Sequence, residues 1–250
     1  MRGTTCWHLG RPVDADAAFE EAVAQLDRLD EDALSTFPFT NVVQMSLCHS
    51  AVNLWLLDRI PEGRARMDRC LELAERTSPF DRTFATQGMA YWGMLTRDPT
   101  LAPHAPAAQQ VARRHGFPQL DALIGVYLGW YEAVMHRSAE GIDHLRAAIA
   151  QMWEVGMRML RVPYQGHLAE ALEVHGRFRE AAAACDDGIA TSGVTGERLH
   201  LPELYRLRGL SALQLGEDGR PLLEQALAEA DAQGAVLLAA RARAALDRHA

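Results

Sequence analysis

The sequence predicts an all-α fold, a right-handed solenoid of about five to six antiparallel helix pairs. Three observations carry this prediction. Ala, Leu, Arg and Glu are abundant among the 250 residues, and these side chains lose little rotamer freedom in a helix. No long alternation of Val, Ile and Thr appears, as half-buried strands would require. Short turns recur at a nearly constant spacing, which is typical of a repeat architecture.

The recurring turns give the length of the repeat. Each lies between two stretches of helical apolar periodicity, and their centres are Gly10, Asp58, Asp98, Arg137, Gly176 and Gly216. The centres are about 40 residues apart, except for a longer first interval. That interval contains the irregular stretch 30–40, whose Pro38 disfavours helix at Phe37. We expect an insertion loop there, which either plugs the core or folds over a groove.

Side chains of similar size recur at fixed offsets after the turns. The clearest sets are Ala15, Phe19 and Ala22, then Gly63, Met67 and Cys70, then Ala181, Cys185 and Gly188. Looser sets follow the other turns: Ile142, Arg146 and Ile149, then Pro103, Ala107 and Gln110, and Ala226 once two residues are removed. Such recurrence is expected when the second helix of each pair packs on the first through the same contacts.

Apolar periodicity then places the helices in chain order. The expected ranges are 14–29, 41–57, 61–77, 82–97, 103–115, 119–136, 138–155, 158–175, 177–192, 201–215, 219–233 and 235–248. Helix ends are expected near Gly116, Gly156, Gly193, Gly196 and Gly234. We expect residues 1–250 to form a single domain, in which the first repeat is truncated and a helix within 235–249 caps the C-terminal end.

Charge and composition exclude several classes of function. The net charge of −8 and the pI near 5.7 argue against direct binding of nucleic acid, because that affinity comes mainly from basic residues that neutralise phosphates. All 25 basic residues are Arg, so a Schiff-base lysine and a phosphate-loop lysine are both excluded. No apolar run has the length of a membrane span or the character of a signal peptide, and we expect a cytoplasmic protein with no membrane partner.

Motifs for metal binding and nucleophilic catalysis are absent. The four cysteines, Cys6, Cys48, Cys70 and Cys185, lack CxxC spacing and are expected to be reduced. The sequence has no HExxH and no GxSxG motif. We therefore predict no catalytic residue, no metal and no cofactor.

Four stretches in the C-terminal half carry a family resemblance. They are EGIDHLRAAIAQ, HLAEALEVHGRFREA, GERLHLPELYRLRGLSALQLGE and ALAEADAQGAVLLAARARAAL. These resemble the C-terminal tetratricopeptide-like region of large bacterial signal-transduction ATPases, such as ATP-dependent transcription activators and adenylate-cyclase-linked regulators. The chain departs from that pattern at Leu210 and Pro202 and in its shortened last turn. The resemblance implies a sensor or docking arm, with an ATPase domain or regulator as its partner.

The concave side of the solenoid is where a binding groove is expected. Residues three and six or seven positions before each turn should face it, and these are Trp7, Trp55, Trp92, Tyr131, Glu170 and Glu173. Farther back along their helices we also expect Tyr127, Glu203 and Arg206 to face it. Aromatic anchors with a polar rim suit a peptide, since Trp and Tyr give a large contact area at small entropic cost. The alternative is that these aromatic side chains fill the core. Arg113 and Arg114, or Arg241 and Arg243, could meet a phosphate or a carboxylate, or could simply be solvated.

These observations lead to one leading hypothesis and two alternatives. The leading one is a non-enzymatic module that binds a protein, a peptide or another ligand in a bacterial regulatory system. The first alternative is a small-molecule sensor or an enzyme with an aromatic pocket inside the superhelix. The second is a homo-oligomer in which the N-terminal faces of two copies pair.

Overall fold

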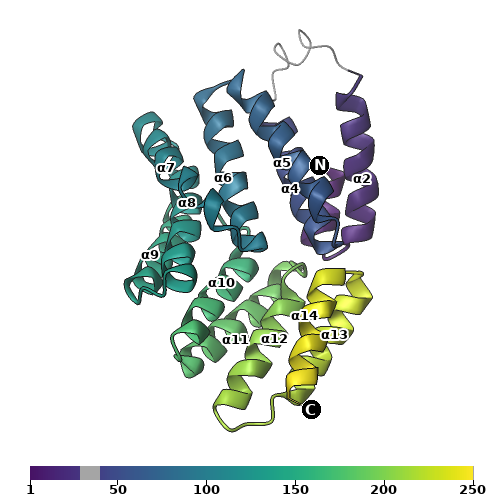
Figure 1. The fold of residues 1–250 in the computed structure, drawn as a ribbon, viewed down its shortest axis with the longest axis vertical. Coiled ribbons are helices and arrows are strands. Elements are labelled where there is room, and N and C mark those ends of the chain that lie inside the picture. Colours follow the sequence, from purple (N-terminus) through teal and green to yellow (C-terminus); the bar gives the residue numbers. More distant parts are fainter. Residues whose placement is uncertain (29–39, 250) are drawn as a thin grey trace.

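A computed structural model describes residues 1–28 and 40–249, and within these ranges the secondary structure is helical throughout (Figure 1). The expected insertion at 30–40 lies outside the described residues, apart from Thr40, which begins a helix. In chain order the elements are α1 (Arg2–His8), α2 (Pro12–Leu26), α4 (Thr40–Leu56), α5 (Ile60–Glu75), α6 (Pro79–Thr96), η1 (Pro99–Leu101), α7 (His104–His115), α8 (Pro118–Trp130), η2 (Tyr131–Met135), α9 (Glu140–Glu154), α10 (Arg161–Val174), α11 (Phe178–Thr195), α12 (Leu201–Gln214), α13 (Arg220–Gln233) and α14 (Val236–Arg248).

The turns within the helix pairs share one backbone conformation. A residue with positive φ stands in each of them: Gly10, Asp58, Arg97, Arg137, Gly176 and Gly216. The φ values lie between 55° and 78°, the left-handed region that ends many helices. Five of these residues are the predicted turn centres, and Arg97 precedes the predicted Asp98 by one. The solenoid of helix pairs is therefore confirmed.

Some helix boundaries differ from the prediction for local reasons. Helix α6 begins at Pro79, earlier than expected, because Ser78 and Asp81 form a reciprocal capping box at its start. Helix α11 continues past Gly193 to Thr195 and ends at Gly196, which has φ of 77°. At the N-terminal end, Arg2–His8 forms a short helix before the first turn, in a stretch that the expected helix ranges do not include.

Small side chains let the second helix of a pair approach the first. Ala15, Gly63 and Ala181, at the predicted offset, are all buried. In the fourth pair the close approach is made by Gly141, where an added Cβ would lie 2.4 Å from the backbone nitrogen of Ala133. Of the predicted set, Ile142 and Ile149 are buried, whereas Arg146 is partly exposed and bonds Glu180.

In the third pair the predicted set was wrong. The buried side chains of α7 are Ala105, Ala108 and Ala112, because the 3-10 turn Pro99–Leu101 delays the start of this helix.

The solenoid curves until its last helices return to its first (Figure 1). Helix α14 contacts α4. The backbone N–H of Arg198 donates to the carbonyl oxygen of His8 at 2.9 Å, and the amide nitrogen of Gln233 donates to the carbonyl oxygen of Arg198 at 2.8 Å. The core therefore lies inside a nearly closed superhelical turn.

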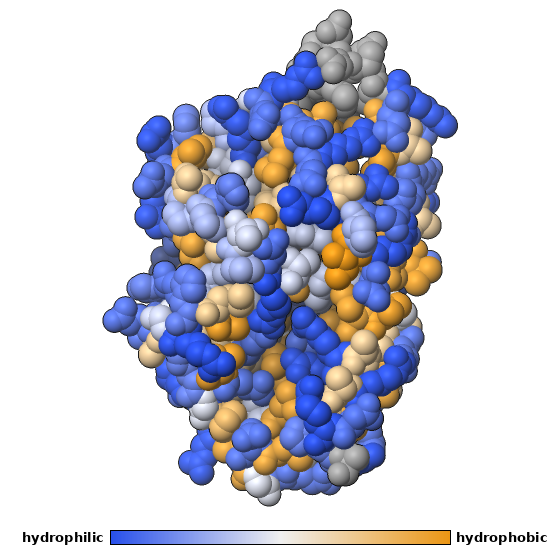
Figure 2. Space-filling view, viewed as in Figure 1, coloured by the Kyte–Doolittle hydropathy of each residue, from blue (hydrophilic) through white to orange (hydrophobic). Residues whose placement is uncertain are grey.

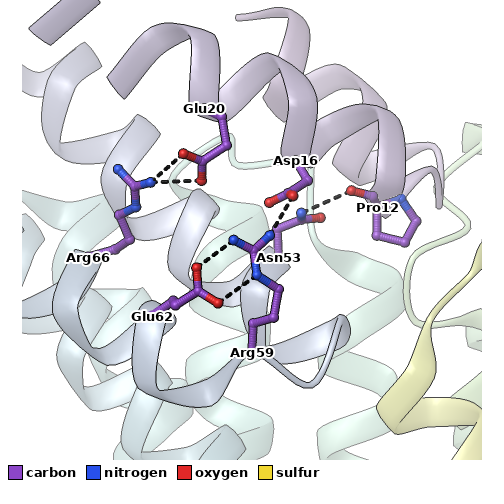
Figure 3. A network of polar contacts seen from close by, with 7 residues as sticks. All are labelled: Pro12, Asp16, Glu20, Asn53, Arg59, Glu62 and Arg66. Atoms are coloured by element: carbon purple, nitrogen blue, oxygen red, sulfur yellow. Dashed lines mark hydrogen bonds and ion pairs between the residues drawn. The ribbon is translucent and has the colours of Figure 1, made fainter. Parts of the chain in front are cut away.

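Charged side chains on the outer surface connect the first helix pair to the second (Figure 3). Arg59 lies between Asp16, at 2.7 Å from its Nη1, and Glu62, which it also bonds. Arg66 donates to both carboxylate oxygens of Glu20 at 2.7 Å. Each of these partly exposed ion pairs contributes little to the stability of the fold. Figure 2 shows that the face seen in Figure 1 is mostly hydrophilic, with apolar side chains gathered where the N-terminal end of α2 approaches α13.

Candidate functional site

The five aromatic residues of the expected groove are all buried. Exposed fractions are 2% or 3% for Trp7, Trp55, Trp92, Tyr127 and Tyr131. Three of them make contacts within the middle helix pairs. Trp92 packs against Gly63, Tyr127 stacks on Tyr91 with ring centroids 5.2 Å apart, and the hydroxyl of Tyr131 donates to the carbonyl oxygen of Asp98. Trp55 and Trp7 instead border two small cavities on the inner side of the superhelix.

The larger of these, which we name the central cavity, lies between the N-terminal and C-terminal helices. Its ionisable lining residues are Arg97, His167, Glu170, His200, Glu203 and Arg241. The central cavity has a volume of about 30 Å³, which is room for about two water molecules. Trp55 and Trp130 form part of the apolar wall.

Arg97 and Glu170 form the first ion pair of the central cavity. Arg97 is the residue with positive φ after α6, and its guanidinium donates to Glu170 on α10. The same guanidinium stands 4.8 Å from the ring centroid of Trp130, and Trp130 Nε1 donates to Glu170 Oε2 at 2.8 Å. The tryptophan thus contacts both members of the pair, an arrangement that combines cation–π and charge-assisted hydrogen bonding.

Arg241 and Glu203 form the second pair. Arg241 Nη1 lies 3.1 Å from Glu203 Oε1, and its guanidinium stands 5.3 Å from the ring centroid of Trp55. Arg206 holds the same carboxylate through both oxygens, at 2.7 and 2.9 Å. Burial alone would raise the pKa of Glu203, but the charges of Arg206 and Arg241 outweigh it and hold that pKa well below its ordinary value.

Two buried histidines border the cavity between these pairs. His167 and His200 are each 7% exposed, and their ring centroids lie 5.8 Å apart. Burial lowers the pKa of each to about 3, with a further contribution from the charge of Arg97 at His167 and from His167 at His200. The tyrosine hydroxyl of Tyr91 lies 3.3 Å from His200 Nε2. His167 Nε2 has no hydrogen-bond partner.

Glu173 lies outside the lining of the central cavity. It accepts a hydrogen bond from Ser211 Oγ at 2.8 Å. Burial raises its pKa to about 7, and the bond to Ser211 opposes that shift. Glu173 therefore titrates near neutrality one helical turn away from Glu170.

Trp7 borders a smaller cavity that shares Pro163 and His200 with the central one. The volume of this smaller cavity is about 10 Å³, enough for about one water molecule. Trp7 Nε1 and Glu197 Oε2 are buried there without hydrogen-bond partners. Two residues that line this small cavity thus each carry a buried polar atom without a partner.

The structure therefore brings together only part of the expected groove. Trp55, Glu170 and Glu203 line the central cavity, and Arg206 contacts it through Glu203. The sequence did not point to Arg97 or Trp130. Arg97 stands beside a predicted turn centre, which was its available signal. Arg241 pairs with the protein's own Glu203, and whether it also binds a ligand stays a prediction.

The described part of the chain has neither a metal-binding cluster nor a membrane-spanning helix. No group of three or more His, Cys, Asp or Glu side chains lies close enough together to hold a metal ion. Among the helices that the structure describes, none is both long and apolar enough to cross a membrane.

Comparison with known proteins gives a likeness of fold. No family model and no curated protein sequence matches the chain. The crystal structure of Bacillus thuringiensis PlcR in complex with the peptide PapR7 and DNA is similar, with a TM-score of 0.64 over 91% of this chain and 82% of the PlcR chain. The two sequences are 15% identical. The chain has a tetratricopeptide-like, all-helical repeat fold, and at this identity the likeness extends to the fold alone.

Proposed function

We propose that this protein is a non-enzymatic interaction module of a regulatory system, which binds a peptide or another small ligand at the central cavity. The observation that carries the proposal is the pair of arginines, Arg97 and Arg241, each placed against a tryptophan and a carboxylate on the inner side of the superhelix. Ligand sites in proteins are typically concave and mostly apolar, with a few convergent polar groups.

The comparison supports a regulatory role by analogy of fold. PlcR in the similar structure is bound to the peptide PapR7 and to DNA. A peptide partner for the present chain fits that analogy. The exclusion of nucleic acid rests on the net charge of −8 and stays a prediction, since PlcR itself is bound to DNA in that structure.

The family resemblance adds a finer proposal. The chain would act as a cytoplasmic sensor or docking arm for an ATPase domain or regulator, as the resemblance to bacterial signal-transduction ATPases implies. The single-domain organisation with a C-terminal capping helix belongs to the same proposal.

Selection of peptides tests the proposed function. A library of random peptides, displayed on messenger RNA, is screened for peptides that bind the protein. The affinities of the selected peptides are then compared for wild type, Arg241→Gln and Arg243→Gln. Both arginines lie on α14, but Arg241 borders the cavity, whereas Arg243 pairs with Asp231 on the outer surface. We expect peptides whose binding is weakened by Arg241→Gln and unchanged by Arg243→Gln. Equal effects of the two variants, or no selected peptide, would contradict the proposal.

A further inference from the structure

We infer that the ligand of the central cavity carries one cationic and one anionic group, as does an amino acid or a short peptide with free ends. This inference rests on the proposed function and specifies the chemistry of its ligand. It follows from the charges that line the cavity and from how each of them is paired.

The lining charges are balanced. Arg97 and Arg241 bring two positive charges and Glu170 and Glu203 two negative ones, in two ion pairs. The carboxylates are largely buried, with side chains 17% and 12% exposed. An anionic group that took Arg97 alone would leave the largely buried Glu170 without its arginine partner, which is costly. A ligand with both signs can exchange partners and keep every charge paired.

The pairs differ in which member can be released. Glu203 is held by Arg206 through both oxygens as well as by Arg241. Arg241 can therefore turn to a ligand carboxylate while Glu203 keeps an arginine partner. Arg241 is also accessible, with 32% of its side chain exposed. We assign the anionic group of the ligand to Arg241, since guanidinium and carboxylate make strong, bidentate hydrogen bonds.

Glu170 suits the cationic group. Its partners are Arg97, whose side chain is 37% exposed, and the indole N–H of Trp130. The indole donor is fixed by burial, whereas the exposed guanidinium can move aside to admit an ammonium group. His167 lines the same cavity, is 7% exposed and has an unpartnered Nε2. In the tautomer with the proton on Nδ1, this nitrogen accepts a hydrogen bond from the ammonium group.

The apolar wall fits the body of the ligand between its two charges. Trp55 and Trp130 both line the cavity, and each ring lies against one of the two arginines. The free space of about 30 Å³ holds only waters, so entry requires the two accessible arginines to move outward. Ligand binding is thus coupled to the contact between Arg241 on α14 and Trp55 on α4.

End-capped peptides test this inference. Four pools of tripeptides made from uncharged residues are titrated while tryptophan fluorescence and the Tm are recorded: free ends, acetylated amino end, amidated carboxyl end, and both ends capped. We expect the free-ended pool to bind at least about tenfold more tightly than either singly capped pool, because each cap removes a charge-assisted hydrogen bond. The doubly capped pool should bind weakest.

Two variants test which residue binds which end of the peptide, and a third variant is the control. Arg241→Gln should abolish the preference for a free carboxyl end and keep the preference for a free amino end, whereas Glu170→Gln should do the reverse. Arg243→Gln, on the same helix, should behave as wild type. Circular dichroism confirms that each variant is folded.

Equal binding of the doubly capped and free-ended pools, or no binding of any pool, would overturn the inference. Neither result removes the proposed function, because peptides from the display selection would still bind in a manner that depends on Arg241.

Discussion

Arg241, in the last helix of the solenoid, stands with its guanidinium 5.3 Å from the ring centroid of Trp55, in the second helix pair. This contact joins the two ends of the superhelix across the central cavity. Arg241 also bonds Glu203, so one side chain connects α4, α12 and α14. The closure of the superhelix and the charge pattern of the cavity therefore depend on the same residue.

A double-mutant cycle measures this closure. We expect Trp55→Leu and Arg241→Gln to be coupled by about 1 to 2 kcal/mol in the free energy of unfolding, since a partly desolvated cation–π contact has about that strength. The measurement is urea denaturation of wild type, both single variants and the double variant. The contact of Arg158 with Trp153, at 4.7 Å, lies outside the closure and is the reference cycle. Additive effects of Trp55→Leu and Arg241→Gln would contradict a closing contact.

Acid should destabilise the protein through the buried histidines. In the folded chain His167 and His200 have pKa values of about 3, below the ordinary 6.5, so unfolding below about pH 6.5 takes up a proton at each. Their stabilising contribution is present above pH 6.5 and is lost as the pH falls towards 3, at about 1.4 kcal/mol per pH unit for each histidine. Glu173, with its raised pKa of about 7, opposes this: its contribution falls as the pH rises from about 4.5 to 7.

The substitution His167→Gln isolates one of these groups. The slope of the free energy of unfolding against pH should become shallower by about 1.4 kcal/mol per pH unit between pH 4 and 6, as measured by urea denaturation. His104→Gln, at an exposed position, should keep the wild-type slope. An unchanged slope for His167→Gln would show that this histidine is protonated in the folded protein.

The contact of Gly63 with Trp92 allows a matched glycine test. A Cβ at residue 63 would lie 2.4 Å from the Trp92 ring and 3.0 Å from the carbonyl oxygen of Ala51, so Gly63→Ala should lower the free energy of unfolding by about 1 to 3 kcal/mol. Gly193→Ala, within α11 and with no atom inside 4 Å of its Cβ, should raise it by about 0.5 to 1 kcal/mol. Stabilisation by both substitutions would mean that α5 and α6 are less closely packed.

Removing Trp92 tests whether the aromatic residues of the middle repeats belong to the core. We expect Trp92→Ala to lower the free energy of unfolding by about 3 to 5 kcal/mol, because the side chain is 2% exposed. Chemical denaturation gives this value, and a display-selected peptide titrated under conditions where the variant is folded should bind as to wild type. Loss of binding without loss of stability would assign Trp92 to the site.

The fold could be predicted from sequence because its determinants are local. The turn residues Gly10, Gly176 and Gly216 were recognisable since glycine adopts positive φ without strain. The register of single helix pairs was harder. In the fourth pair the choice between Gly141 and Ile142 as the close-contact residue depends on the π-helical turn Tyr131–Met135, which has no clear signature in one sequence.

The central cavity could be predicted only in part, because it depends on how far the superhelix curves. Counting back from the turns pointed to Trp55, Glu170 and Glu203, which lie on the first helices of the second, fifth and sixth pairs. Arg241 reaches the cavity from the last helix, and only the closure brings it there. The cumulative rotation of successive repeats sets that closure, and sequence periodicity does not reveal it.

The most direct test of the proposed site is a crystal structure of the protein with a peptide obtained by selection. We expect the peptide between Trp55 and Trp130, with its anionic group on Arg241 and its cationic group on Glu170. A peptide bound on the outer surface, with the Arg241 to Glu203 and Arg97 to Glu170 pairs both intact, would contradict it.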